Sequence, residues 1–266
     1  FGLHGEEGSK MASLYLENVL DDIESGIVKP AAVILEAVQG EGGVIPAPIS
    51  FLKEVRRITE KHGILMICDE IQAGMGRTGK MFAYDHADIV PDIVLISKAV
   101  GGGLPMAVIM YNHKLDVWGP GTHAGTFRGN QMAMATGAAG IKYMLNEDLP
   151  GKVAVKGAKL MENLKNIAKQ APELADVRGR GLMIGVEAVD PTKPAVRGAH
   201  PSFGEFAARV QAGCFRRGMI IEKGGRHGAV LRFLPPLIVS DAEIDQACGI
   251  FEEAVKEARV WAQNRK

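Results

Sequence analysis

Apolar residues recur at two different spacings along the first half of the chain. Residues 9–26 carry apolar side chains at every third or fourth position, which predicts an amphipathic helix. Residues 51–62 repeat this spacing, with Ser50 in front as a candidate cap and Gly63 as the stop signal. Short, mainly apolar segments, which predict buried strands, span residues 31–38, 64–70 and 92–98.

The alternation of apolar strands with helices predicts how these elements are arranged. Strands that are apolar throughout are typical of a parallel sheet that is covered on both faces. Ligands of such sheets bind beyond the carboxyl ends of the strands. Glu36, Asp69 and Lys98 stand at the carboxyl ends of the three predicted strands. The first half therefore predicts an α/β fold with a candidate site at this edge.

The second half predicts a smaller α/β unit. Its expected helices span 130–146, 149–170, 203–218 and 240–266, the last capped by Ser240. Strands are expected at 218–223 and 228–236, whereas 177–189 reads as a turn leading into a strand. We expect residues 1–147 to belong to a large domain and residues 148–266 to form a small C-terminal domain.

Composition excludes several classes of protein. Hydrophobic residues make up 47% of the 266 residues, which is typical of a globular protein with a core. Lys+Arg and Asp+Glu both number 31, so no overall charge attracts the chain to nucleic acid or to an anionic membrane. No apolar run approaches the ~20 residues of a membrane span.

The cysteines bear on metal sites and on location. Cys68, Cys214 and Cys248 lie far apart and form no CxxC or Cys/His cluster. This spacing supports neither a zinc site nor a disulfide framework, so we expect no metal. A reducing, cytoplasmic location fits three unpaired cysteines.

Two glycine-rich motifs resemble nucleotide-binding motifs. GMGRTGK at 74–80 has the spacing of a phosphate-binding loop, but Met81 stands where magnesium binding requires Ser or Thr. GRGLMIG at 179–185 has one residue too many between its last two glycines for a dinucleotide site. We expect neither to bind a nucleotide, and we expect the first to form a loop.

Asp69 and Lys98 together match the needs of pyridoxal phosphate. One lysine must condense with the aldehyde of this cofactor, and an acidic residue must keep its pyridine nitrogen protonated. Singly, each residue is weak support, because an Asp at a strand end is more often a cap and a Lys there is usually solvated. Their positions at the ends of two successive strands make the cofactor a hypothesis.

Longer motifs sharpen this hypothesis. LEAVQGEGGV, CDEIQAGMGRTGKMFAYDHADIVPDIVLISKAVGGGLPMA and THAGTFRGNQMAMA resemble, in this order, the signature blocks of class III (ω-) aminotransferases. RGRGLMIGVE and LRFLPPL extend the resemblance over nearly the whole chain. It implies a fold-type I transferase with pyridoxal 5'-phosphate as cofactor, a mainly parallel sheet in the large domain and a smaller C-terminal α/β domain.

The resemblance also implies residue roles at the cofactor. Lys98 would form the Schiff base and move a proton between substrate and cofactor, and Asp69 would pair with the pyridine nitrogen. Gln72 would hydrogen-bond the phenolic oxygen, and Ile71 would pack on one face of the ring. Thr126 would reach the cofactor phosphate of a neighbouring subunit, which implies a homodimer with shared active sites.

Glu41 and Arg232 match a pair that distinguishes substrates in the family. With an ω-amine donor bound, the Glu neutralises the Arg. With glutamate or 2-oxoglutarate bound, the Arg is released and clasps the α-carboxylate with two N–H groups. The alternative is a static salt bridge.

Two departures from the common family pattern point to a substrate. Arg128 replaces a small residue in GTFRGN, and Ala37 stands where many members have Pro. Both resemble the branch that moves the 4-amino group of L-2,4-diaminobutyrate to 2-oxoglutarate, giving aspartate 4-semialdehyde and glutamate. We expect Arg128 to place a carboxylate or the cofactor-facing loop, unless it is an exposed or interface charge.

Other functions remain open from the sequence. A class III transaminase could use ornithine, 4-aminobutyrate or an amine of specialised metabolism. A non-catalytic fragment or binding module is the remote alternative, since the family's phosphate-binding and ring-stacking residues would lie upstream of Phe1. The chain opens on FGLHGEEGSK without an initiator Met, so we expect an N-terminal segment to be missing.

Overall fold

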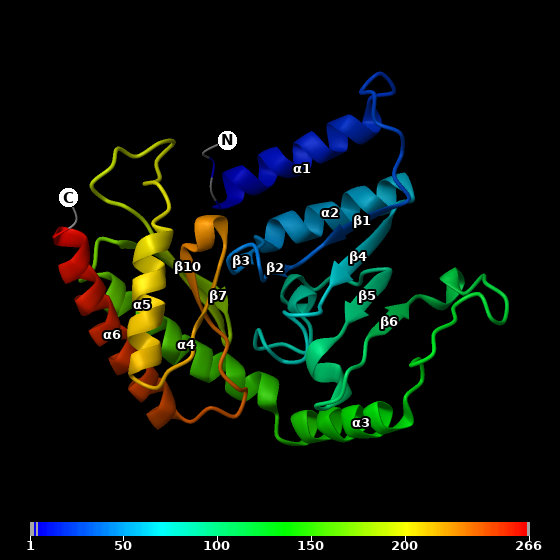
Figure 1. Cartoon of the computed structure of the whole chain (residues 1–266). Coiled ribbons are helices and arrows are strands. Elements are labelled where there is room, and N and C mark those ends of the chain that lie inside the picture. The colour runs from blue at the N-terminus through cyan, green and yellow to red at the C-terminus, as the bar shows by residue number, and fades with distance from the viewer. Residues whose placement is uncertain (1–2, 4, 265–266) are drawn as a thin grey trace.

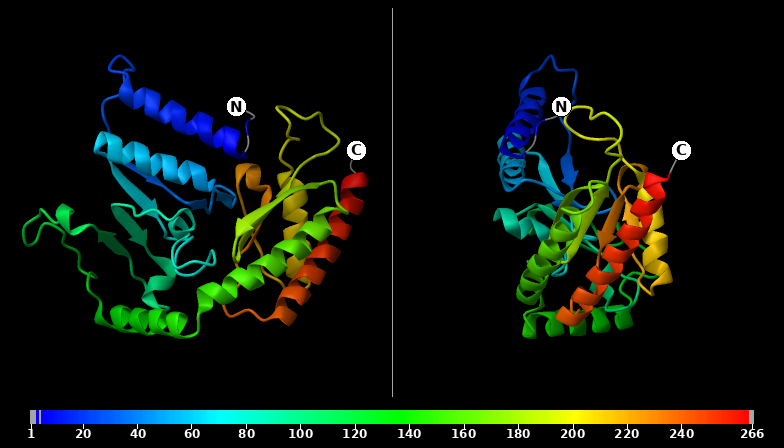
Figure 2. Two further views of the ribbon diagram at one scale, coloured as in Figure 1. Left: turned by 180° about the vertical axis from the view of Figure 1, so that it is seen from behind. Right: turned by 90° about the vertical axis from the view of Figure 1, so that its left-hand side faces the viewer.

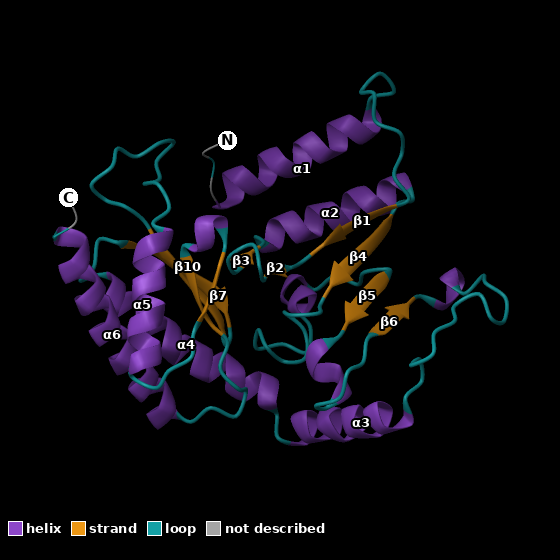
Figure 3. Ribbon diagram, in the orientation of Figure 1, coloured by secondary structure: helices purple, strands orange, loops and turns teal. Residues whose placement is uncertain are grey.

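The strands of the described residues form two four-stranded sheets and one two-stranded hairpin. The computed structural model describes Leu3 and residues 5–264. The first sheet has the order β1-β4-β5-β6, in which β1, β4 and β5 are parallel and β6 is antiparallel (Figures 1 and 3). These strands span Ala32–Leu35, Leu65–Asp69, Ile93–Ile96 and Val108–Tyr111, respectively. The mainly parallel sheet confirms the predicted α/β fold.

Two helices lie above this sheet, with α1 (Gly5–Asp21) outside α2 (Ile49–His62) (Figure 1, top). The predicted cap Ser50 is wrong. The helix α2 starts after Pro48 without a side-chain cap, and the Ser50 hydroxyl hydrogen-bonds Ser9 at 2.9 Å. Gly63 ends α2 in the left-handed conformation, as predicted.

The two faces of the first sheet differ in burial, which corrects the expectation of a sheet covered on both. Met66 and Cys68 point into a core shared with Leu52 of α2. The register places the alternate residues on the opposite face, where Ile34 is 59% exposed and Ile109 50%. Within the described residues, this chain therefore covers one face well and leaves the other partly open.

The second sheet has the order β7-β8-β10-β9 and is antiparallel throughout. Its strands span Leu174–Arg180, Met183–Ala188, Val230–Phe233 and Glu222–Gly224. The segment 177–189, expected to be a turn followed by one strand, is a hairpin of β7 and β8. Gly181, with φ 53°, provides its turn and lies against the backbone of Thr78, where a Cβ would clash.

Three helices pack on the second sheet: α4 (Leu149–Ala168), α5 (Gly204–Arg216) and α6 (Asp241–Gln263). The last contacts both others (Figure 2). Ser240 caps α6 in a capping box with Glu243, as predicted; residues 265–266 of the expected helix lie outside the described ones. None of the described helices combines the length and apolar composition that crossing a membrane requires.

Short elements complete the chain. Helix α3 (Gln131–Asn146) is capped by Asn130 and leads into α4. The remaining elements are the hairpin strands β2 (Val38–Gln39) and β3 (Ile45–Pro46) and the 3₁₀ turns η1 (Ala83–Ala87), η2 (Lys98–Gly101), η3 (His113–Leu115) and η4 (Arg226–Gly228).

Arginine side chains join the two sheets. Arg178 of β7 donates from Nη2 to the carbonyl of Gly43 at 2.7 Å and from Nε to that of Val44 at 3.0 Å. Arg77 donates across the same joint to the carbonyl of Leu182 at 3.2 Å. The glycine motif at 74–80 is therefore a loop at this joint, as expected.

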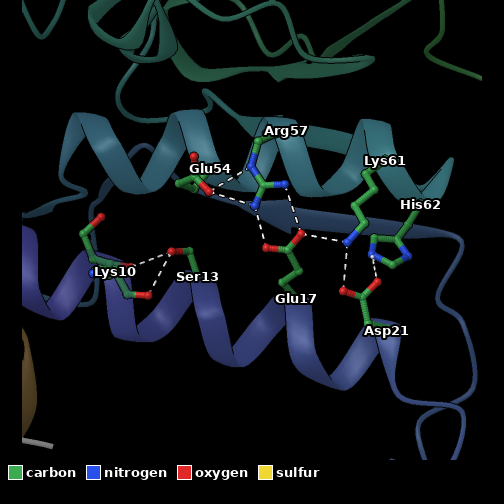
Figure 4. A network of polar contacts seen from close by, with 9 residues as sticks. Lys10, Ser13, Glu17, Asp21, Glu54, Arg57, Lys61 and His62 are labelled. Atoms are coloured by element: carbon green, nitrogen blue, oxygen red, sulfur yellow. Dashed lines mark hydrogen bonds and ion pairs between the residues drawn. The ribbon is translucent and has the colours of Figure 1, made fainter.

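Ion pairs attach α1 to α2 (Figure 4). Glu17 contacts Arg57 at 2.6 Å and Lys61 at 2.9 Å, and Asp21 contacts Lys61 at 2.8 Å and His62 at 3.3 Å. Hydrogen bonds from Arg57 and then Lys61 lower the pKa of Glu17 from 4.5 to about 2. Glu17 therefore stays ionised in the folded protein at pH values where an unpaired Glu is protonated.

Acid should loosen the packing of α1. The contribution of Glu17 to stability is complete above pH 4.5 and is lost as the pH falls toward 2, because a lowered folded-state pKa favours folding only while the carboxylate is ionised. The protection of the α1 amides against hydrogen exchange, relative to the intrinsic exchange rate at each pH, should fall over this range. Glu17→Gln should show the lower protection already at pH 7, whereas Glu24→Gln should behave as the unmodified protein. Equal exchange in both variants would contradict this role.

Candidate active site

The carboxyl ends of β1, β4 and β5 lie along one edge of the first sheet, as predicted. Glu36 and Asp69 bind backbone there. Glu36 accepts a hydrogen bond from the amide of Gly40 at 2.8 Å, and Asp69 Oδ1 accepts one from the amide of Ile71 at 3.0 Å. These bonds orient the loops that follow the two strands.

Lys98 stands just beyond β5 in an unusual conformation. Its φ is 52°, which is uncommon for a residue with a side chain, and the side chain is exposed. The following turn η2 is held by α3, since Thr136 Oγ1 donates to the carbonyl of Gly101 at 2.7 Å. A Cβ on Gly102 would lie 2.4 Å from the Thr136 carbonyl oxygen, so glycine is required for this approach. The backbone that carries Lys98 is therefore firmly placed.

A cavity of about 580 Å³ lies between the two sheets. Lys98, Ile71 and Gln72 line it from the first sheet. Arg232 of β10 and Glu222 of β9 line it from the second. Residues far apart in the sequence thus share one cavity with the candidate lysine.

Gln72 has an unsatisfied polar atom. Its side-chain Oε1 is buried and has no hydrogen-bond partner among the described residues. It lies against Gly40, where a Cβ would come within 1.7 Å of it. Because an unpaired buried amide is costly, this side chain is suited to a polar group of a bound molecule.

Arg232 is buried between carboxylates. Its side chain is 4% exposed, and Nη1 contacts Glu41 at 2.7 Å while Nη2 contacts Glu222 at 2.8 Å. The hydrogen bond from Arg232 is the main reason that the pKa of Glu41 is lowered, and the charges of Arg232 and Lys98 add to it. The structure thus brings Glu41 and Arg232 into contact, while their role in substrate binding stays a prediction.

Arg128 and Thr126 belong to an extension, residues 112–130, that runs out from the end of β6 (Figure 1, right). Arg128 shares a second cavity, of about 1020 Å³, with Lys98 and Phe127. Thr126 is exposed. The structure places Arg128 on the same cavity as the lysine, and the roles of both residues stay predictions.

Glu70 was missed by the motif analysis. It is fully buried, and its carboxylate accepts hydrogen bonds from the amides of Ala83 at 2.8 Å and Tyr84 at 3.0 Å. Burial raises its pKa to about 7 against the effect of these bonds. Alternation along β4 could have revealed it, because Glu70 follows Met66 and Cys68 at spacings of two. It closes the loop that carries Ile71 and Gln72.

The chain matches known proteins over nearly its whole length. The family described as aminotransferase class-III matches residues 4–255. A diaminobutyrate–2-oxoglutarate aminotransferase from Rhizobium meliloti (strain 1021) is 53% identical over 96% of this chain and 54% of its own length. A protein of the same name from Haemophilus influenzae is 49% identical over 97% of this chain and 57% of its own. This chain thus spans about half the length of these curated relatives.

A solved structure agrees with these sequence matches. The ornithine aminotransferase from Toxoplasma gondii superimposes with a TM-score of 0.79 at 30% identity, over 94% of this chain and 55% of that one. That structure is described with partial occupancy of pyridoxal phosphate at its active site.

Removing the Glu70 carboxylate should destabilise the protein. Glu70→Ala leaves the amides of Ala83 and Tyr84 without their acceptor, and each unpaired buried donor costs about 1–3 kcal/mol. We expect the free energy of unfolding in urea to fall by about 2–4 kcal/mol. Asp85→Ala removes a half-buried carboxylate of the same loop that accepts one backbone hydrogen bond, from the amide of Phe82, and should cost less. A Glu70→Ala protein as stable as the original would show that the hydrogen bonds of Glu70 do not stabilise the loop.

Proposed function

Because this chain belongs to the class III aminotransferase family, we propose that it forms part of a pyridoxal-phosphate-dependent transaminase. The proposed reaction moves the 4-amino group of L-2,4-diaminobutyrate to 2-oxoglutarate in a ping-pong cycle. Aspartate 4-semialdehyde and glutamate are the other substrate pair. The observation that carries the proposal is the cavity shared by Lys98, Gln72 and Arg232. The names of the two curated relatives support the choice of substrates.

The residues at the sheet edge fit the cofactor. Lys98 offers an amine for its aldehyde, and Asp69 offers a carboxylate for its pyridine nitrogen. The Gln72 side chain lines the same cavity and suits the phenolic oxygen, because its N–H₂ group can donate a hydrogen bond to that acceptor. Ile71 supplies an apolar surface for the ring. Bound there, the cofactor supplies an electron sink for the substrate's reacting carbon.

Lys98 is proposed to move the proton in the reaction. Its side chain is exposed at the cavity, on a backbone held by α3. From this position Nζ takes a proton from the reacting carbon of the substrate and delivers it to the cofactor. General acid–base steps of this kind contribute about 10²–10⁴-fold in rate.

Glu41 and Arg232 are proposed to exchange partners between the two half-reactions. Glu41 is 78% exposed, whereas the Arg232 side chain is 4% exposed, so the carboxylate is the member that can withdraw. Arg232 then offers N–H groups to the α-carboxylate of glutamate or 2-oxoglutarate. With an ω-amine donor bound, Glu41 returns and neutralises the guanidinium.

A homodimer with shared active sites is proposed from the extension. Phe127, next to Thr126 in the chain, is 88% exposed and Trp118 of the same extension is 49% exposed, and apolar side chains of this size favour an interface. Thr126 would then bind the cofactor phosphate of the neighbouring subunit, and Arg128 would place a carboxylate or the cofactor-facing loop.

Two further assignments are proposals of the same kind. The division into residues 1–147 and 148–266 is supported by the break between α3 and α4 and by a separate core around the second sheet. A cytoplasmic location is supported by three free cysteines, each buried.

Trapping the cofactor on lysine tests the proposed chemistry. Borohydride reduction of the purified protein with pyridoxal phosphate should add one reduced cofactor mass to the peptide that contains Lys98. Lys98→Ala should lose this label and at least about 10²-fold in activity. The exposed Lys142→Ala, on α3, should label as the unmodified protein does. Labelling at another lysine, or none, would overturn the assignment.

A panel of amines tests the substrate. We expect kcat/KM to be highest for 2,4-diaminobutyrate, with ornithine and 4-aminobutyrate at least about tenfold lower, a difference of about 1.4 kcal/mol in transition-state binding. A preference for ornithine would favour the alternative suggested by the Toxoplasma gondii enzyme. Arg128→Gly should reduce the preference for diaminobutyrate over 4-aminobutyrate. An unchanged ratio would remove Arg128 from substrate selection.

A further inference from the structure

A second carboxylate contacts the buried arginine of the cavity. Glu222 and Arg232 are directly opposite residues in the pairing of β9 with β10, and Oε2 of Glu222 lies 2.8 Å from Nη2. Glu222 also lines the cavity that contains Lys98. None of the sequence motifs pointed to this residue, because its partner is ten positions away on another strand.

Glu222 is held by strand pairing and is less exposed than Glu41, with 59% of its side chain exposed against 78%. The strand register fixes it across from Arg232, while Glu41 lies in the turn between β2 and β3. The guanidinium itself rests on Gly224, where a Cβ would lie 3.0 Å from Nε, so a side chain at that position would displace it. When Glu41 withdraws, Glu222 can therefore stay on Nη2.

Glu222 changes the net charge of the cluster around Arg232. Arg232 and Glu41 alone form a neutral pair, and Glu222 gives the cluster a net negative charge. Arg77 also lines the cavity, but its guanidinium is bound to the carbonyls of Leu182 and Pro235. Its charge and that of Lys98 are the same with or without Glu222. The contribution of Glu222 can therefore be measured by removing its charge.

We propose that Glu222 is a specificity-determining residue that selects amino donors carrying a second ammonium group. This inference rests on the proposed function and concerns the same cavity. At neutral pH a diamino acid is a net cation, 4-aminobutyrate is a zwitterion without net charge, and 2-oxoglutarate is a dianion. Glu222 lines the cavity with 59% of its side chain exposed, and its negative charge attracts the first and repels the last. Glu222 thus favours the donor and speeds release of the dicarboxylate.

Glu222→Gln tests this inference in the holoenzyme. The amide oxygen can still accept a hydrogen bond from Arg232, so the change removes charge while it conserves shape. The ratio of kcat/KM for 2,4-diaminobutyrate to that for 4-aminobutyrate should fall about threefold to fivefold, the range expected for the charge of a partly exposed side chain. The KM for 2-oxoglutarate should fall about threefold or more. Glu162→Gln, an exposed change of the same charge on α4, should leave both values unchanged.

Effects of opposite sign separate a charge effect from a structural one. A uniform rise in KM for all substrates, or an unchanged donor ratio, would overturn the proposal. If the unmodified protein prefers another amine, the proposed donor is wrong. The ratio of kcat/KM for ornithine to that for 4-aminobutyrate, compared between the unmodified protein and Glu222→Gln, would then measure the same charge effect. Dissociation constants measured by calorimetry for ornithine and 2-oxoglutarate provide the comparison without turnover. Glu222→Gln should weaken the binding of ornithine and strengthen the binding of 2-oxoglutarate.

Discussion

The candidate site depends on hydrogen bonds that join the second sheet to the turn between β2 and β3. Arg178 of the second sheet binds the carbonyls of Gly43 and Val44, and the amide of Gly225 binds the carbonyl of Glu41 at 3.0 Å. These bonds tie the turn that carries Glu41 to the sheet that carries Arg232. Because backbone carbonyls are the acceptors, the joint is defined by chain geometry more than by the side chains of the first sheet.

The loops at the cavity are firmly held, whereas the side chains of the reactive residues are exposed. Glu70 and Thr136 bind backbone on either side of the sheet edge and hold the loops after β4 and β5. Lys98 and Glu41, which the proposed chemistry requires to move, are exposed. A rigid backbone beneath mobile reactive side chains allows both precise placement and exchange of partners. Arg232 and Glu222 line the cavity with opposite charges, and the pairing of their strands sets their positions.

Sequence reasoning succeeded where the signal is local. The apolar runs placed Asp69 and Lys98 at strand ends, and the parallel register brought those ends to one edge. It failed where a longer-range contact decided the outcome. Ser50 has the chemistry of a cap, yet its hydroxyl binds Ser9 of α1. The hairpin of β7 and β8 was missed because its turn at Gly181 is specified by contact with the backbone of Thr78.

The sequence by itself determined the main helices, the three parallel strands, the caps at Gly63 and Ser240 and the family resemblance, because helix and strand periods and capping residues act over a few positions. The tertiary structure decided which further charge meets the pair that the resemblance had named. Glu41 and Arg232 are 191 positions apart, and Glu222 joins them only through the register of β9 and β10. No local pattern encodes such a contact, because the energy of burying a charge depends on partners that only the folded chain assembles.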